Sequence, residues 1–408
     1  MDFAPLWFKF YRFLNHQVTK TTKDHKGISF IMDKGTKQFS EEEQIRYSRH
    51  FVLPRFGPDA QLKLKKASVA VIGAGGLGSP VLLYLAAAGI GFIKIIDNDL
   101  VSLSNLQRQI LFSMDDLNKS KAEIAASRIT RLNPMIKIKA IRERIESANA
   151  LKLLEDVDVV IDCTDNFPTR YLLNDACVLL DKPLVYGSVF RYEGQVGVFN
   201  YKKGINYRDF YPTPPDASQI PNCEEGGVLG VLTGIIGSLQ TNEAIKIITG
   251  ISEPLAGKVL IFDSDTLETT IVKIPDRNSR DTIKTLINYD EFCNVSATKS
   301  TQPMKEVTVQ ELKAMMDSKA DFQLIDVREP HEFDICNLDG ELIPQGEIPN
   351  SVERVSKDKK VIIQCRSGAR SGNMVQWLEK NHGFTNLYNL KGGILAWAKE
   401  IDPSMPTY

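Results

Sequence analysis

The sequence predicts a two-domain α/β protein, in which a large doubly wound domain with a mostly parallel sheet precedes a smaller α/β domain. A chain of 408 residues has room for about two or three domains. Strand-like and helix-like apolar segments alternate along it, which implies parallel strands joined by right-handed crossovers. Residues 294–303 are rich in Ser, Thr, Ala, Lys and Gln, as flexible linkers are. We therefore expect an extension at 1–39, a first domain at 40–293, a linker at 294–304 and a second domain at 305–408.

In the first domain, Ser40 with Glu43 three residues later predicts a capped helix start. Residues 67–99 then follow as a strand, a glycine turn, an apolar helix and a second strand. The later elements that we expect are helices at 121–132, 148–154 and 228–249, strands at 136–140, 157–165 and 258–263, a β-rich segment at 183–201, and a Pro-rich loop at 211–222.

The second domain has the same alternation on a smaller scale. We expect a helix at 307–318, strands at 322–329 and 360–365, a short loop, and helices at 371–382 and 392–400.

Composition excludes several classes of protein. A hydrophobic fraction of 43% and a charged fraction of 25% are ordinary for a globular protein. A net charge of -1 gives no electrostatic reason to expect a nucleic acid partner. The six cysteines contain no CxxC pair, which favours a reducing compartment and a cytoplasmic location.

The N-terminal extension contains a short aromatic run that Lys9 and Arg12 interrupt. It is shorter than the about 20 apolar residues that span a bilayer, and it lacks the features of a secretory signal. We expect a poorly ordered segment and no membrane partner, with a weak surface-binding helix as the alternative.

The glycine turn carries the first chemical signal. Gly73, Gly75 and Gly78 have the GxGxxG spacing of a Rossmann-like fold, where glycines serve a tight turn whichever nucleotide is bound. Asp97 ends the next strand and would suit the ribose of NAD. An NAD-dependent oxidoreductase is therefore one hypothesis.

The residues after Asp97 favour adenylation instead. A reaction that expels pyrophosphate must screen negative charge and hold phosphates. Arg108 and Lys121 could neutralise those phosphates. Asp165 follows a buried strand, where a carboxylate could hold Mg²⁺ beside ATP. Solvated surface charges and a helix cap are the alternatives.

A second signal is the segment CRSGARS at 365–371. Cys365 lies between a strand and a helix N-terminus, whose free N–H groups stabilise a sulfur anion. Arg366 and Arg370 would add positive charge. A buried structural cysteine is one alternative. A phosphatase loop is another, although it would place its arginine one residue further from the cysteine.

Motifs of the first domain resemble, in order, those of the MoeB/ThiF adenylyltransferases, relatives of the ubiquitin-activating enzymes. They are RYSRH (46–50), GAGGLGSP (73–80), DNDLVSLSNLQRQILF (97–112), DCTDNFPTR (162–170), CEEGGVLG (223–230) and GSLQTNEAIK (237–246). The resemblance covers about residues 40–295. It implies a homodimer that adenylates the C-terminal Gly-Gly carboxylate of a ubiquitin-like sulfur carrier, such as a MoaD- or ThiS-like protein.

The same resemblance implies a set of residues that contact ATP or its metal. Arg49 would reach the phosphates from the neighbouring subunit. The other residues are Gly76, Asp97, Ser104, Asn105, Leu106, Gln107, Arg108, Lys121, Asp165 and Asn166.

The sequence departs from this family at its structural zinc site, which two CxxC pairs usually form. Asn206 and Asp209 occupy the cysteine places of the first pair, and residues 275–282 contain no cysteine. A structural zinc site takes about four thiolate or imidazole ligands. We therefore predict no structural zinc, with packing or side-chain hydrogen bonds in its place.

The second domain resembles a rhodanese domain through LIDVREPHEF (324–333), CRSGARS (365–371) and NLKGGILAWA (389–398). The resemblance implies that Cys365 carries a persulfide received from a sulfur donor such as a cysteine desulfurase. Asp326 and Arg328 would support the persulfide loop. The loop residues are Cys365, Arg366, Ser367, Gly368, Ala369 and Arg370.

Together the two domains predict an enzyme that adenylates a sulfur carrier and then sulfurates it. Cys223 could attack the adenylate and form a thioester or mixed acyl disulfide, with a spectator role as the alternative. The other cysteines, Cys163, Cys177, Cys293 and Cys336, are expected to be structural. A scaffold that binds the carrier without catalysis also stays open. The choice among molybdopterin, thiamine, tRNA thiolation and other pathways stays open as well.

Overall fold

The computed structural model describes residues 36–215, 227–293 and 304–407. The chain forms two compact units, of which the first is built on residues before 287 and the second mainly on residues after it. The expected extension at 1–39 and the linker at 294–304 lie almost wholly outside the described residues. Among those that are described, no helix combines the length and the apolar character needed to cross a membrane.

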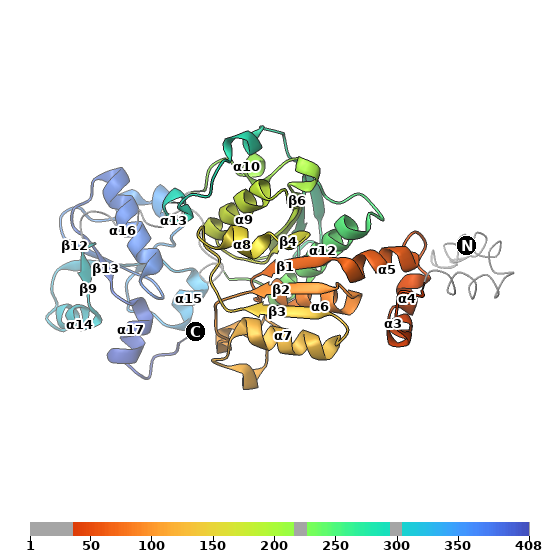
Figure 1. Ribbon diagram of the computed structural model, residues 1–408. Helices are drawn as coiled ribbons and strands as arrows, with labels where there is room; N and C mark the ends of the chain where they lie inside the picture. Colours follow the sequence, from red (N-terminus) through yellow and green to blue (C-terminus); the bar gives the residue numbers. More distant parts are fainter. Residues whose placement is uncertain (1–35, 216–226, 294–303, 408) are drawn as a thin grey trace, which may run out of the picture. The chain divides into compact units, whose positions relative to one another are not determined.

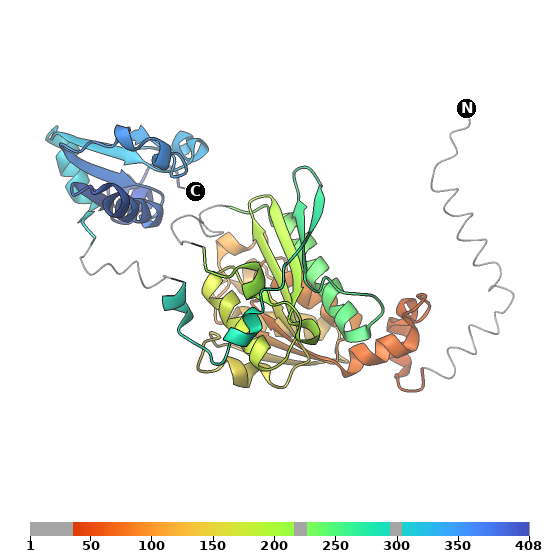
Figure 2. The same ribbon diagram turned by 90° about the horizontal axis from the view of Figure 1, so that it is seen from above.

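The first unit is organised around an eight-stranded sheet (Figure 1). Its strand order is β3-β2-β1-β4-β5-β6-β7-β8. The first five strands in that order are parallel, and the remaining pairings are antiparallel. The strands are β1 (Ser68–Ile72), β2 (Phe92–Ile96), β3 (Lys137–Ile141), β4 (Val159–Asp162), β5 (Leu184–Phe190), β6 (Glu193–Phe199), β7 (Lys258–Asp263) and β8 (Thr269–Lys273). The predicted doubly wound, mostly parallel sheet is confirmed. The β7–β8 hairpin forms its exposed edge (Figure 2).

Helices cover both faces of this sheet. Helices α6, α7 and α12 lie on one face, and α8 and α9 lie on the other (Figure 1). The helices are α3 (Glu41–Arg46), α4 (Ser48–Phe51), α5 (Gly57–Lys66), α6 (Gly78–Ala88), α7 (Lys121–Leu132), α8 (Ala150–Leu154), α9 (Phe167–Leu179), α10 (Tyr207–Phe210), α12 (Gly230–Thr249) and α13 (Tyr289–Phe292). Short 3-10 turns are η1 (Leu103–Asn105), η2 (Met114–Asp116), η3 (Tyr201–Lys203) and η4 (Ser279–Thr282).

Local sequence explains the helix boundaries that matter for the site. The Ser40 hydroxyl accepts from the Glu43 N–H, and the Glu43 carboxylate accepts from the Ser40 N–H, which is the expected capping box. Helix α7 occupies the predicted residues and begins after Ser120, whose hydroxyl caps it. Helix α6 ends at Gly89, which has a left-handed φ of 84°, a conformation that suits glycine.

The second unit contains a five-stranded parallel sheet in the order β11-β10-β12-β13-β9. Its strands are β9 (Glu306–Val307), β10 (Phe322–Asp326), β11 (Glu341–Leu342), β12 (Lys360–Gln364) and β13 (Leu387–Leu390). Its helices are α14 (Val309–Asp317), α15 (Pro330–Ile335), α16 (Ala369–His382) and α17 (Gly393–Glu400), with 3-10 turns η5 (Ile348–Asn350) and η6 (Val352–Arg354). The sequence did not predict β9, β11, β13 or α15. These elements are short, and tertiary pairing rather than local pattern stabilises such segments.

Candidate functional site

The glycine turn closes tightly between β1 and α6. Gly73 has a φ of 92°, and a Cβ there would lie 2.8 Å from the Cys163 carbonyl oxygen. A Cβ at Gly78 would collide with the Gly73 carbonyl oxygen. Both positions therefore require glycine, because any larger residue would displace the backbone.

Asp97 lies directly beside this turn. Its carboxylate accepts a hydrogen bond from the Ala74 N–H at 2.7 Å and one from the Asp99 N–H at 2.8 Å. Burial raises the pKa of this carboxyl, and the two N–H donors oppose that rise. The structure thus brings the predicted ribose-binding acid to the predicted nucleotide turn.

Residues 104–109 pack between the glycine turn and the first turn of α12. A Cβ on Gly76 would lie 3.0 Å from the Thr233 Cγ2 atom. The Thr233 hydroxyl donates to the Arg108 carbonyl oxygen at 3.4 Å. Gly230 lies so close to Gln107 that a side chain there would collide with the Gln107 carbonyl oxygen. The structure therefore brings together Gly76, Gln107 and Arg108.

The predicted phosphate-binding side chains are partly engaged within the protein. The Arg108 guanidinium donates to the Ser104 carbonyl oxygen at 3.1 Å. Asn105 is buried, and its side-chain oxygen accepts from the Ser102 N–H at 3.3 Å. Leu106 is half-buried between them and packs against the hydrophobic core.

Lys121 is buried at the start of α7 and forms an ion pair with Asp99, with 2.9 Å between Nζ and Oδ2. Its positive charge also acts to lower the pKa of Asp97. Asp99 was not identified from the sequence. Its position two residues after Asp97, the predicted ribose-binding acid, could have indicated it. Asp99 holds the Lys121 ammonium near Asp97. If a polyanion bound here, Lys121 would exchange its ion pair with Asp99 for one with that anion.

Asp165 and Asn166 follow β4, which pairs directly with β1. Both residues are exposed, so they are accessible at the carboxyl ends of the strands, where ligands of open α/β sheets bind. The described residues contain no cluster of three or more His, Cys, Asp or Glu side chains that could enclose a metal. A single accessible carboxylate fits Mg²⁺, which is commonly held by one or two carboxylates together with substrate phosphates.

Asp162, at the end of β4, is a fully buried carboxyl that sequence reasoning missed. One of its oxygens accepts from the Thr164 N–H at 2.9 Å and the Thr164 hydroxyl at 2.6 Å. The other has no hydrogen-bond partner among the described residues. Burial raises the pKa of Asp162, and the nearby charge of Arg170 opposes this. Asp162 thus shapes the turn that leads to Asp165.

Arg49 lies far from the glycine turn of its own chain. Tyr47, at the start of α4, packs against Gly89 at the end of α6. Its hydroxyl accepts from the Asn133 side chain at the end of α7, at 2.9 Å. Helix α4 therefore lies near the C-terminal ends of α6 and α7. This is the side where the parallel strands begin, whereas the nucleotide turn lies where β1 ends.

Cys365 follows β12 and lies under the start of α16 in the second unit. Its sulfur accepts from the Gly368 N–H at 3.2 Å and lies 3.3 Å from the Ser371 hydroxyl. That hydroxyl also donates to the Asn389 side chain at 2.6 Å. Gly368 has a φ of 92°, so the loop turns inward around the sulfur. Ser367 and Ala369 are exposed and Arg366 is half-buried.

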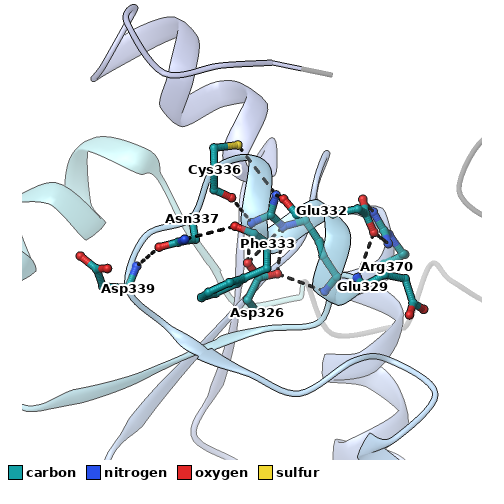
Figure 3. Close-up of polar contacts among 9 residues, drawn as sticks. Asp326, Glu329, Glu332, Phe333, Cys336, Asn337, Asp339 and Arg370 are labelled. Atoms are coloured by element: carbon teal, nitrogen blue, oxygen red, sulfur yellow. Dashed lines mark hydrogen bonds and ion pairs between the residues drawn. The ribbon is translucent and has the colours of Figure 1, made fainter.

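The sequence suggested that Arg370 adds positive charge to the loop. In the structure, the charge of Arg370 is paired with Glu332 instead. Its guanidinium makes two hydrogen bonds of 2.6 Å to the Glu332 carboxylate (Figure 3). The side chains of Arg370 and Glu332 are only 7% and 9% exposed. Glu332 comes from α15, an element that the sequence did not predict. This pair therefore ties α15 to the start of α16.

A second buried pair supports α15 from the other side. The Arg328 guanidinium binds the Asp326 carboxylate at 2.7 Å, and both side chains are fully buried. It also donates to the Glu332 carbonyl oxygen at 3.2 Å and the Cys336 carbonyl oxygen at 2.7 Å. Asp326 and Arg328 thus hold both ends of α15, and their predicted role at the persulfide loop stays a prediction.

We expect Glu332→Ala to lower the free energy of unfolding of the second unit by about 3–5 kcal/mol, because it removes the carboxylate from a buried ion pair. Chemical denaturation of the full chain, followed through the transition of this unit, measures the change. The matched control is Glu353→Ala, because Glu353 is exposed. A Glu332 variant as stable as the control would show that the pair contributes little.

Cys223 lies outside the described residues, so its predicted role has no structural test. Cys163, Cys177, Cys293 and Cys336 are all buried, and so is Cys365, so burial alone does not distinguish the expected structural cysteines from the persulfide candidate. Burial raises the pKa of the Cys163 and Cys177 thiols.

Comparisons with known proteins find relatives of both parts of the chain. The model of the ThiF family matches residues 47–284, and that of the Rhodanese-like domain matches residues 308–400. A probable adenylyltransferase/sulfurtransferase MoeZ from Mycobacterium tuberculosis is 45% identical over 379 residues, covering 90% of this chain and 96% of the relative. An adenylyltransferase and sulfurtransferase MOCS3 from Drosophila yakuba is 41% identical over 391 residues, covering 91% and 86%.

A solved structure extends the comparison to a bound nucleotide. The crystal structure of E. coli MccB with ATP aligns with a TM-score of 0.51 and 27% identity, covering 56% of this chain and 71% of that one.

Proposed function

The chain belongs to the ThiF family and carries a rhodanese-like domain, and from that premise we propose that it adenylates a ubiquitin-like sulfur carrier and then sulfurates it. It is an enzyme of the adenylyltransferase and sulfurtransferase class, as relatives similar to most of its length are named for both activities. The observation that carries the proposal is the hydrogen bond between Asp97 and the glycine turn, with the charge of Lys121 acting on Asp97. Arg108 and Asp165 are proposed to complete this site.

In the first half-reaction, ATP is the substrate that lies on the glycine turn. The Asp97 carboxylate accepts hydrogen bonds from the ribose hydroxyls, and Arg108 and Lys121 bind the phosphates. Asp165 would hold Mg²⁺, which supplies charge neutralisation at the phosphates. An oxygen of the carboxylate at the carrier's C-terminus attacks the α-phosphorus of ATP and forms a new P–O bond. The bond from the α-phosphorus to the bridging oxygen breaks, and pyrophosphate leaves with its electrons.

In the second half-reaction, Cys365 holds a persulfide received from a donor such as a cysteine desulfurase. The N–H groups of the loop and of α16 hold the sulfur anion in place. The terminal sulfur attacks the carbonyl of the acyl-adenylate and AMP leaves, which joins the carrier to Cys365 through an acyl disulfide. A second thiolate then attacks the Cys365 sulfur, so that the S–S bond breaks, the carrier leaves as its thiocarboxylate, and the new disulfide is reduced by an external thiol. Cys223 remains a candidate for a thioester or acyl disulfide intermediate between these steps.

The proposed carriers are MoaD- or ThiS-like proteins with a C-terminal Gly-Gly, in molybdopterin, thiamine or related sulfur-cofactor synthesis. A cytoplasmic location is proposed from the cysteine pattern. The deciding experiment is carrier-dependent exchange of label between pyrophosphate and ATP, with the two carrier types offered separately. Exchange with either type supports adenylation. Carrier binding without exchange would instead support a non-catalytic scaffold.

We also propose a homodimer in which Arg49 serves the partner's site. The reason is that α4 lies where the parallel strands begin, away from the chain's own nucleotide turn at the end of β1. Arg49→Ala and Asp165→Asn chains would each be inactive as homodimers. Mixed before assembly, they should recover about one quarter of the wild-type exchange rate, since a two-fold heterodimer restores one site. The matched control mixes Asp97→Ala with Asp165→Asn, which share one site and should recover nothing. If Arg49 acts within its own chain, the first mixture will also stay inactive.

A further inference from the structure

The structure describes the place where the family resemblance implies a zinc site. Helix α10 begins after Asn206, and Asp209 is its third residue. The segment that contacts it contains Arg277 and Ser279. Ser279 is the first residue of η4. These two stretches stand where the two CxxC pairs are expected.

The Asp209 carboxylate joins the two stretches and is 2% exposed. Its Oδ1 atom accepts from the Arg277 N–H at 3.1 Å and the Ser279 N–H at 3.2 Å. Its Oδ2 atom accepts from the Asn206 N–H at 2.9 Å and the Asn206 side-chain amide at 3.1 Å. Four N–H donors therefore occupy the lone pairs of both oxygens.

Asn206 is equally saturated and is fully buried. Its amide nitrogen donates to Asp209 and, at 2.8 Å, to the Ser279 hydroxyl. Its side-chain oxygen accepts from the Arg208 N–H at 3.0 Å and from the Asn174 amide at 3.2 Å. Two donors and two acceptor sites are all that a side-chain amide offers.

Arg277 closes the contact from the other side. Its guanidinium Nε donates to the Asp209 carbonyl oxygen at 3.1 Å, near the end of α10. This carbonyl is among the last of a helix, which have no partner inside the helix and gain from a cationic donor.

These residues do not fit zinc. The described residues at this place offer neither thiolate nor imidazole, whereas structural zinc takes about four such ligands. Its carboxylate and amide oxygens are already engaged by hydrogen bonds, and a metal ion could bind them only by displacing those donors.

We propose that Asn206, Asp209, Arg277 and Ser279 form a metal-free clasp that joins α10 to the 277–279 segment in place of zinc. The clasp holds both stretches through hydrogen bonds to one buried carboxylate. Since no thiolate takes part, the stability of the first unit does not depend on zinc supply or on thiol oxidation at this place. The inference stands whether or not the proposed adenylation is correct.

The test uses the full chain, produced in medium with added zinc. Elemental analysis should find far less than one zinc per chain, and the melting temperature should not change with a zinc-selective chelator. Asp209→Asn should lower that temperature by about 5–10 °C, because it leaves buried N–H donors unpaired. The matched control, Asp281→Asn, alters an exposed carboxylate of the same segment and should change nothing.

Two results would overturn the clasp. One is stoichiometric zinc whose removal lowers the melting temperature of the wild-type chain. The other is an Asp209→Asn chain as stable as the Asp281→Asn control. If Asp209→Asn does not fold, the zinc content and chelator response of the wild type still decide the question, and Ser279→Ala provides a milder variant with a smaller expected shift.

Discussion

Asp165→Asn is expected to lower carrier-dependent pyrophosphate exchange by about 100- to 1,000-fold, the usual effect of removing one group that stabilises developing charge. The substitution keeps the size of the side chain but removes the carboxylate proposed to hold Mg²⁺ beside the phosphates. Asp165 is exposed, so the stability of the fold should change by less than about 0.5 kcal/mol. The measurement is the initial rate of label exchange at saturating ATP and carrier.

The matched control for this variant is Glu155→Gln, which makes the same carboxylate-to-amide change at an exposed position after α8. It should retain full exchange. Persulfide formation at Cys365 should persist in the Asp165 variant, because that chemistry belongs to the second unit. Exchange that survives intact in the Asp165→Asn chain would refute the assigned role of this carboxylate.

Cys365→Ala is expected to abolish sulfur transfer while leaving pyrophosphate exchange at the wild-type rate. The sulfur is the only atom of this side chain that can carry a persulfide, so no residual transfer through the loop is possible. The readouts are the mass of the peptide that contains residue 365 after incubation with a sulfur donor, and the amount of carrier thiocarboxylate formed.

Cys336→Ala is the control for this variant, since Cys336 is a buried cysteine of the same unit. It should still accept sulfur at Cys365. If the Cys365→Ala chain formed thiocarboxylate at the wild-type rate from the same donor, the carrier would be receiving sulfur by a route that bypasses this unit.

Sequence alone predicted the parts of the site that depend on local constraints. The turn at Gly73 and Gly78 is dictated by backbone contacts that only glycine allows, so its spacing is readable. Asp97 and Asp165 are readable because strand ends in a parallel sheet share one edge. Helix α7 was predicted with its observed bounds, because its helical pattern lies within one short segment.

The remaining parts depend on partners that are distant in sequence. Glu332 and Arg370 are separated by two strands and several turns, and nothing near either residue announces their pairing. Asp162 is one acidic residue at a strand end among several, and only burial distinguishes it. Asp209 could be recognised as the residue in a cysteine place, but its donors Arg277 and Ser279 are 68 and 70 residues away in the sequence, and no local pattern indicates them. The boundaries at 293 and 305 remain predictions, because residues 294–303 lie outside the described part of the chain.

The pairing of Arg370 with Glu332 has a consequence for how the two half-reactions respond to ionic strength. Glu332 neutralises Arg370, and the Gly368 N–H donates to the Cys365 sulfur, so we expect a sulfur anion here to depend on short-range N–H dipoles, which salt screens weakly. ATP, by contrast, is expected to bring several negative charges to the half-buried Arg108 and to Lys121, which is buried and paired with Asp99, and salt ions compete with its phosphates for these cations. Raising the salt concentration should therefore slow adenylation well before it affects persulfide chemistry, and the two activities on this one chain would separate along a salt titration.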